Sequence, residues 1–274
     1  MTATRPVLRW HGGKWRLAPW IISHFPEHRI YTEVYGGAAS VLIRKPRCYS
    51  EVYNDLNGDV VNLFRVLQDK DLSSRLVSML RLTPFARDEF EISYQPMTDP
   101  LERARRIVIV SFMGFGSSAV NRDRLTGFRS NSNRSGTTPA HDWANYPDSL
   151  LAIISRLRGV VIENRPALEV LLQHDASDAL HYVDPPYVHT TRKPGNEKNY
   201  TPEMTDADHQ ELARTLKTMT GGVIVSGYHS PLYDGLYDGW HRVEIDALAD
   251  GAKERVEVLW INDAAWETNQ GKLL

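Results

Sequence analysis

Hydrophobic and polar residues along the chain follow two periods, one typical of strands and one typical of helices. Residues 16–25 place apolar side chains on one face of a helix. Residues 31–35 and 49–53 read as short strands, and each is followed by a helical pattern, at 38–43 and 59–67. This succession of strand and helix predicts parallel strands joined by crossover helices.

The same alternation returns near residue 160 after a long interruption. We expect strands at 160–163, 180–183 and 222–226, and helices at 167–173 and 206–218. The last two strand candidates, 240–245 and 255–261, are joined by a connection too short for a crossover helix, so they should pair antiparallel. The pattern therefore predicts an α/β fold with a mostly parallel sheet that ends in an antiparallel hairpin.

The interruption has a different character. Residues 71–113 are mostly helical in pattern, whereas residues 114–147 are rich in Gly, Ser and Asn with scattered arginines, which is typical of a loop or small hairpin outside the core. We therefore expect one domain formed by residues 1–70 and 150–274, with residues 71–149 as a mainly helical insertion. Loops that extend from the carboxyl ends of parallel strands are where such sheets bind ligands.

Composition places the chain among ordinary globular proteins. The 274 residues are 42% hydrophobic and 24% charged, with a net charge of −2, and no apolar run approaches the ~20 residues of a membrane span. The single cysteine, Cys48, allows no internal disulfide, so a cytoplasmic location is expected. The histidines show no metal-ligand spacing, and no bound metal is expected. Oligomeric state cannot be read from these features.

Positive charge is concentrated within the insertion. Between Leu101 and Gly136, seven arginines face only two acidic residues. Such a basic segment in a nearly neutral protein indicates one anionic contact surface. For three of the arginines taken alone, a solvated helix face is the favoured interpretation: Arg103, Arg105 and Arg106. The other four are candidates for contacts with an anionic partner: Arg122, Arg124, Arg129 and Arg134.

The sharpest chemical signal is Asp184-Pro185-Pro186-Tyr187, directly after an apolar strand. An aromatic amino group is a poor nucleophile, because its lone pair is delocalised into the ring, and acceptors for its N–H groups help the nitrogen to become pyramidal. Asp184 and a backbone carbonyl of the proline pair can supply those acceptors. Tyr187 offers a flat face for an extruded base. The bland alternative is a proline turn with a chance tyrosine.

Three weaker motifs suggest a nucleotide-like cofactor. Glu33 to Ser40 forms a strand-to-helix turn in which Gly37 lets a ligand approach the backbone. Asp55 ends the next strand, where a carboxylate accepts bonds from ribose hydroxyls, although Asp55 or Asn57 can equally cap the following helix. Trp10-His11-Gly12-Gly13-Lys14 can pack on a flat group and meet a carboxylate, or be a surface loop.

Together these motifs resemble the Dam-type, α-group DNA adenine methyltransferases, in bacterial or prophage form, over nearly the whole chain. The resemblance implies a Rossmann-like methyltransferase sheet, S-adenosylmethionine as cofactor, double-stranded DNA as partner and residues 71–149 as the target-recognition module. It implies cofactor contacts from Trp10, Lys14, Glu33, Gly37, Asp55 and Asp184. It also implies that the flipped adenine is held by Asp184, Pro185, Pro186 and Tyr187.

The expected reaction is direct methyl transfer to N6 of adenine at a specific DNA site. Methylation of cytosine N4, of RNA or of a glutamine amide suits the same motif, and a catalytically silent DNA-binding relative is a further alternative. The turn departs from the family pattern, because Tyr35-Gly36-Gly37-Ala38-Ala39 ends in alanine instead of glycine. That methyl group matters if the position needs a positive φ. The recognised DNA sequence is not implied.

Overall fold

The chain divides by its internal contacts into two compact units. The computed structural model describes residues 2–116, 120, 125–131, 136–188, 191, 203–249 and 253–270. The first unit comprises Met1–Trp15, Gly37–Arg44 and Asn57–Arg158, and the second comprises Arg16–Gly36, Lys45–Leu56 and Gly159–Leu274. The predicted assignment of residues 71–149 to target recognition stays a prediction.

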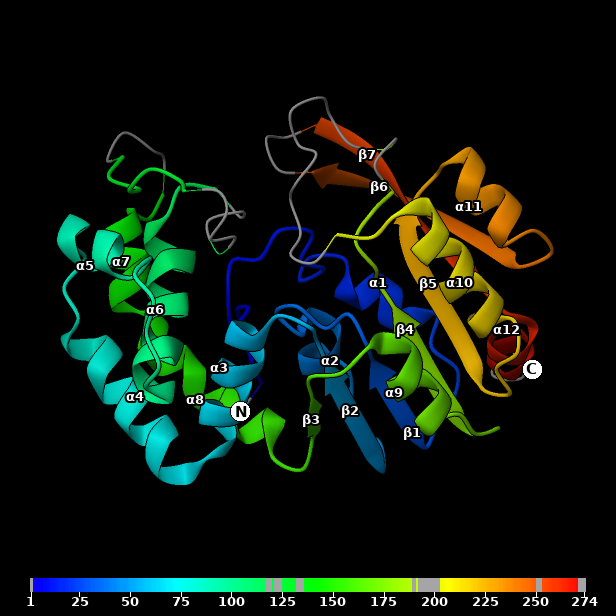
Figure 1. The fold of residues 1–274 in the computed structure, drawn as a ribbon, viewed down its shortest axis with the longest axis horizontal. Helices are drawn as coiled ribbons and strands as arrows, with labels where there is room; N and C mark the ends of the chain where they lie inside the picture. Colours follow the sequence, from blue (N-terminus) through cyan, green and yellow to red (C-terminus); the bar gives the residue numbers. More distant parts are fainter. Residues whose placement is uncertain are drawn as a thin grey trace. The chain divides into compact units, whose positions relative to one another are not determined.

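The second unit contains a seven-stranded sheet in the part of the chain that the structure describes (Figure 1). Its strand order is β3-β2-β1-β4-β5-β7-β6. Strands β1 to β5 run parallel, and β7 is antiparallel to both β5 and β6, which confirms the predicted fold class. The strands are β1 (Ile30–Glu33), β2 (Ser50–Asn54), β3 (Val161–Glu163), β4 (Ala179–Val183), β5 (Gly222–Tyr228), β6 (His241–Ala249) and β7 (Lys253–Ile261).

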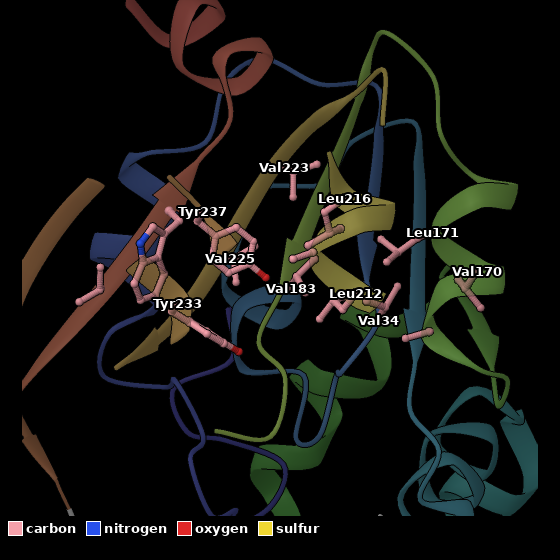
Figure 2. Close-up of a cluster of buried hydrophobic side chains, with 14 of the residues drawn as sticks. Val34, Val170, Leu171, Val183, Leu212, Leu216, Val223, Val225, Tyr233 and Tyr237 are labelled. Carbon is pink, nitrogen blue, oxygen red and sulfur yellow. The ribbon is translucent and has the colours of Figure 1, made fainter. Parts of the chain in front are cut away.

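One face of this sheet, here called the apolar face, is packed against helices. Figure 2 shows Val183, Val223 and Val225 of the strands within a buried cluster that also holds Leu171 and Leu212. The helices of this cluster are α9 (Ala167–Gln173), α10 (Asp206–Leu216) and α11 (Pro231–Leu236). Burial of these side chains stabilises the unit by removing apolar area from water, at about 25 cal/mol per Å².

The opposite face, here called the polar face, is packed against α12 (Asp263–Gln270) and against Phe25, which lies just beyond α1 (Ala18–Ser23). Phe25 follows α1, and its ring centroid lies 5.8 Å from that of Tyr31 and 6.0 Å from that of Tyr182. Side chains alternate along a strand, so the strand residues adjacent in sequence to those of the apolar cluster point to the polar face. They carry unusual polarity for a buried face: Tyr31, Glu33, Glu51, Tyr53, Tyr182, Ser226 and Glu257.

The register of the central strands brings their carboxyl ends to one edge. Glu33, the last residue of β1, pairs with Tyr53 of β2 on one side and with Tyr182 of β4 on the other. The chain runs outward from β1 to β2 and β3, then returns to β4, so strand order reverses between β1 and β4. In open α/β sheets, ligands bind outside the carboxyl ends of the strands at such a switch point.

The first unit is helical over most of its described residues. Asn57, Asp69 and Asp99 cap the starts of α3, α4 and α6, each accepting backbone N–H groups with its side chain. The helices are α2 (Ser40–Arg44), α3 (Gly58–Gln68), α4 (Lys70–Leu82), α5 (Arg87–Ile92), α6 (Pro100–Met113), α7 (Pro139–Ala144) and α8 (Tyr146–Leu157).

The expectation that residues 114–147 lie outside the core is wrong at their carboxyl end. Thr138 caps α7, and the helix buries Trp143, whose indole N–H donates to the Thr83 carbonyl oxygen at 2.9 Å. Tyr146 is also buried, and its hydroxyl donates to the Val7 carbonyl oxygen at 2.6 Å. The Gly- and Ser-rich composition of the preceding residues concealed this short apolar stretch.

Candidate active site

Asp184 is the first residue beyond β4, at the carboxyl edge of the sheet and beside the switch point. All five residues of β4 are buried, so the strand fixes where this carboxylate emerges. Val183 pairs with Val225 of β5, and the next position along β5 is Ser226. The Ser226 hydroxyl donates to Asp184 Oδ1 at 2.7 Å.

A second hydroxyl extends this contact. The Tyr182 hydroxyl oxygen lies 3.0 Å from Ser226 Oγ, and both residues are buried. Ser226 has a single proton and gives it to the carboxylate, so Tyr182 donates to Ser226. Burial raises the pKa of Tyr182 well above its usual value, and the negative charge of Asp184 raises it further. Tyr182 therefore stays a proton donor, and Asp184 is held by a chain of two hydroxyl groups.

Tyr187 is held by side chains of β5 and β7. Its hydroxyl donates to Glu257 Oε1 of β7 at 2.7 Å, and both residues are buried. The Tyr228 ring of β5 meets the Tyr187 ring edge-on, with centroids 4.4 Å apart. Both the hydroxyl and the ring of Tyr187 are therefore positioned by neighbouring strands.

Glu33 is a buried carboxylate at the end of β1, and the Tyr31 hydroxyl donates to its Oε2 at 2.8 Å. Burial, followed by the charge of Glu33, raises the pKa of Tyr31 well above its usual value. The ammonium of Lys45 lies 4.5 Å from the centroid of the Tyr31 ring and 2.8 Å from Glu51 Oε1. Glu33 is thus the end of a buried polar chain that crosses the polar face.

Asp55 follows β2 at the same edge of the sheet. The side chain of Asn54 donates to the Val34 carbonyl oxygen at 2.9 Å and accepts from the Arg165 amide at 2.9 Å, so it fixes the strand end. The following helix is capped by Asn57, which accepts from the amides of its first turn. The capping role that competed with ribose binding therefore belongs to Asn57 and not to Asp55.

Three predicted cofactor residues, Trp10, Lys14 and Gly37, lie in the first unit. Gly37 has a φ of +47°, and an added Cβ would lie 2.5 Å from the indole nitrogen of Trp10, so only glycine fits there. Lys14 is buried, and its ammonium donates to the Gly12 carbonyl oxygen at 3.0 Å. The structure thus brings Trp10 and Gly37 together.

The departure in this turn falls on a position with positive φ. Ala39 has a φ of 51° and is the one non-glycine residue with positive φ in the described part of the chain. Left-handed backbone costs an ordinary residue about 1–2 kcal/mol. The turn therefore stores strain where the family pattern has glycine.

The arginines of the insertion divide into two groups. Arg122, Arg124 and Arg134 lie outside the described residues. Arg129 is described: its amide donates to the Met113 carbonyl oxygen at 2.7 Å, and its guanidinium lies 4.0 Å from Asp142. Its contact with DNA stays a prediction.

The alternative of a solvated helix face for the other three arginines is wrong, because each is bound within the first unit. Arg103 pairs with Asp59 at 2.8 Å. Arg105 and Arg106 both pair with Glu102, at 2.7 and 2.8 Å. These ion pairs hold α6 in place. The positive charges of the three arginines are therefore paired with carboxylates of the same unit.

None of the described helices is long and apolar enough to cross a membrane. Within the same described ranges, no group of three His, Cys, Asp or Glu side chains is placed to hold a metal ion.

Residues 10–250 match the model of the D12 class of N6 adenine-specific DNA methyltransferases. The chain belongs to this family. The Dam-type resemblance, the enzyme class and the adenine N6 specificity are thereby confirmed, and S-adenosylmethionine-dependent chemistry is general for methyltransferases of this kind.

Two individual proteins are similar to this D12-class chain. A DNA adenine methylase of Haemophilus influenzae is 22% identical over 273 residues, covering 93% of this chain and 91% of the relative. Among solved structures, the rRNA methyltransferase AviRa of Streptomyces viridochromogenes has a TM-score of 0.40 and 13% identity, covering 94% of this chain and 87% of that one.

Sequence reasoning assigned no site role to three residues around the D12-class motif: Tyr182, Ser226 and Glu257. Tyr182 could have been noticed as a tyrosine two positions before Asp184 on the same strand face. Ser226 and Glu257 could not be assigned, because their proximity to the motif depends on the pairing of β5 with β4 and with β7.

Proposed function

We propose that the chain transfers a methyl group from S-adenosylmethionine to N6 of an adenine flipped out of double-stranded DNA, at the carboxyl edge of the sheet. The observation that carries this proposal is the carboxylate of Asp184, held at 2.7 Å by Ser226 directly before the ring of Tyr187. Asp184 accepts an N6–H, and a carbonyl oxygen of Pro185 or Pro186 accepts the other. Tyr187 stacks on the base.

Bond changes in this reaction need few groups from the protein. The cofactor supplies an electrophilic methyl group on a sulfonium. The N6–carbon bond forms as the carbon–sulfur bond breaks, and N6 then releases one proton. Asp184 is the group placed to stabilise the positive charge that develops on N6 and to receive that proton. No covalent protein intermediate is required.

The residues at the ends of β1 and β2 suit the cofactor in chemical type. Glu33 and Asp55 are acceptors, which ribose hydroxyls and cationic groups require. Gly37 lets the Trp10 indole approach the backbone, because an added Cβ would lie 2.5 Å from the indole nitrogen. We therefore propose cofactor contacts from Glu33, Asp55 and Asp184. The contacts of Trp10, Lys14 and Gly37 are carried by the sequence resemblance.

Product analysis tests this function directly. Purified protein is incubated with unmethylated plasmid DNA and S-adenosylmethionine, and the nucleosides are separated by mass spectrometry. We expect N6-methyladenine from the natural protein and none above background from Asp184→Ala. N4-methylcytosine would favour the cytosine alternative, and cofactor binding without methylated DNA would direct the test to RNA and protein substrates.

DNA binding by the insertion needs a separate test. We propose that Arg122, Arg124, Arg129 and Arg134 divide between phosphate and base contacts. Each lost phosphate contact lowers the slope of log affinity against log salt by about 1. Replacing all four with alanine should therefore weaken binding and flatten this slope. Unchanged affinity and slope would exclude the proposal.

A further inference from the structure

Two side chains of β7 reach the segment that follows Asp184. Arg255 and Glu257 are two positions apart, so they lie on the same face of their strand. Glu257 accepts the Tyr187 hydroxyl at 2.7 Å, and the Arg255 guanidinium donates to the Thr191 carbonyl oxygen at 3.0 Å. We call this pair the β7 brace. It contacts the segment at two points four residues apart.

The contact with Glu257 is a strong one by its chemistry. A hydroxyl that donates to a carboxylate makes a shorter and roughly twice stronger hydrogen bond than a neutral pair. Glu257 is 2% exposed and Tyr187 is 7% exposed, so water competes little for either group. The bond therefore restrains both the position and the tilt of the tyrosine ring.

Arg255 completes the arrangement through its contact with the Tyr228 ring. Its guanidinium carbon lies 4.9 Å from the centroid of the Tyr228 ring, and that ring meets Tyr187 at an interplanar angle of 63°. Tyr228 of β5 pairs directly with Glu257 of β7. The antiparallel register of these two strands thus sets the positions of Glu257 and Tyr228 beside Tyr187.

We infer that the β7 brace is a positioning device for the target base, in which Glu257 holds the Tyr187 ring in the plane that receives the extruded adenine. This inference rests on the proposed function. A ring that is fixed before the base arrives loses less conformational freedom on binding. Glu257 acts through Tyr187 and is a positioning residue, because nothing requires it to touch the base.

A double-mutant cycle tests whether Glu257 works through the tyrosine hydroxyl. The proteins are the natural chain, Tyr187→Phe, Glu257→Gln and the double variant, with Glu244→Gln as the matched control on the exposed side of β6. Initial rates with plasmid DNA give kcat and the KM for DNA, calorimetry gives the Kd for S-adenosylmethionine, and thermal melting confirms folding.

Tyr187→Phe should lower kcat about tenfold, as loss of a hydrogen bond to a charged group implies. Glu257→Gln keeps an acceptor oxygen, so its loss should be smaller, and the double variant should be no slower than Tyr187→Phe. Cofactor Kd should not move. Losses that multiply in the double variant, or a Glu257→Gln protein that matches Glu244→Gln in kcat, would overturn the inference.

A measurement independent of turnover separates this inference from the proposed function. The protein is labelled with fluorotyrosine, and the signal of residue 187 is assigned by its loss in Tyr187→Phe. Glu257→Gln should shift and broaden that signal, whereas Glu244→Gln should not. An unchanged signal contradicts the brace even if the protein methylates adenine. A shifted signal without N6-methyladenine from the natural protein contradicts the proposed function instead.

Discussion

On the apolar face of the sheet, Val183 of β4 and Val225 of β5 pack against helices. Their neighbours along the same strands, Tyr182 and Ser226, point to the polar face and form a hydrogen bond with each other there. Both faces are buried, yet they contribute differently. The apolar face stabilises the unit by excluding water, with little demand on geometry. The polar face must match each donor with an acceptor, so it fixes directions as well as positions.

Within the polar face, charge is handled in two ways. Towards the start of β2, Glu51 is paired with the ammonium of Lys45. At the carboxyl edge, Glu33, Asp184 and Glu257 each accept a hydrogen bond from a hydroxyl group. A hydroxyl group orients a carboxylate and leaves its negative charge uncompensated, whereas an ammonium orients the carboxylate and also neutralises its charge. Carboxylates bound by hydroxyl groups therefore suit a site that must stabilise positive charge in a reaction. The carboxylate bound by an ammonium suits a structural pair.

The largest expected effect comes from breaking the structural pair. Lys45→Met should lower the free energy of unfolding by about 4 kcal/mol, because Glu51 loses its buried partner. Denaturant unfolding measures the loss. The exposed pair of Arg81 and Asp148 is the control, and Arg81→Met should cost less than about 1 kcal/mol. If Lys45→Met costs no more than this control, the structural role is wrong.

A histidine makes the apolar face sensitive to acid. His181 is buried, its Nδ1 lies 2.7 Å from Thr32 Oγ1, and burial lowers the pKa of His181 to about 4 from 6.5. As pH falls, the unfolded chain binds the proton first. The stabilisation is therefore complete above pH 6.5 and is lost progressively down to pH 4, about 3 kcal/mol in all.

The measurement is the free energy of unfolding between pH 4 and pH 7. His181→Gln should flatten its dependence on pH, whatever the variant costs at neutral pH. A variant that keeps the slope of the natural protein would show that another group carries the acid sensitivity.

The hydroxyl chain at the carboxyl edge should affect catalysis more than stability. Ser226→Ala removes the donor to Asp184 and should lower kcat about thirtyfold, with a smaller change in the KM for DNA. Tyr182→Phe, one bond further from the carboxylate, should lower kcat less. Steady-state kinetics measure both. If Ser226→Ala raised only KM, Asp184 would not depend on this hydroxyl for its orientation.

The smallest expected effect is that of a substitution at Tyr31, which contacts both Lys45 and Glu33 on the polar face. Tyr31→Phe keeps the ring beside Lys45 but removes the hydroxyl that binds Glu33. The Kd for S-adenosylmethionine should rise about fivefold, which corresponds to the free energy of one ordinary hydrogen bond, about 1 kcal/mol. The free energy of unfolding should fall by little more than this amount. Calorimetry measures the Kd. An unchanged Kd would mean that Glu33 needs no help from Tyr31 or does not contact the cofactor.

Much of the fold followed from periodicity alone. The strands around 31–35, 49–53 and 180–183 were predicted to within about two residues, because runs of apolar residues ended at Gly, Asn or Pro. The antiparallel end of the sheet was predicted from the short connection between its last strands. Short helices such as α7 and α11 were missed, because Gly, Pro and Ser at their ends resemble turn sequences.

The candidate site was predicted only as far as its motifs are contiguous in sequence. Asp184 and Tyr187 carry recognisable chemistry in one tetrapeptide. Their supports come from β5 and β7, and no local pattern states which residues of separate strands will pair. The arginines of α6 show the converse error, because Arg105 and Arg106 look available in sequence but are bound to Glu102.

The central claim is that Asp184 acts on the amino group of the target base, and single-turnover methyl transfer tests it most directly. Asp178→Asn is the matched control, since Asp178 is an exposed aspartate at the opposite end of β4. We predict that Asp184→Asn binds DNA but transfers methyl groups about 10³-fold more slowly, and that Asp178→Asn retains the natural rate. An Asp184→Asn protein that matched Asp178→Asn would contradict the account.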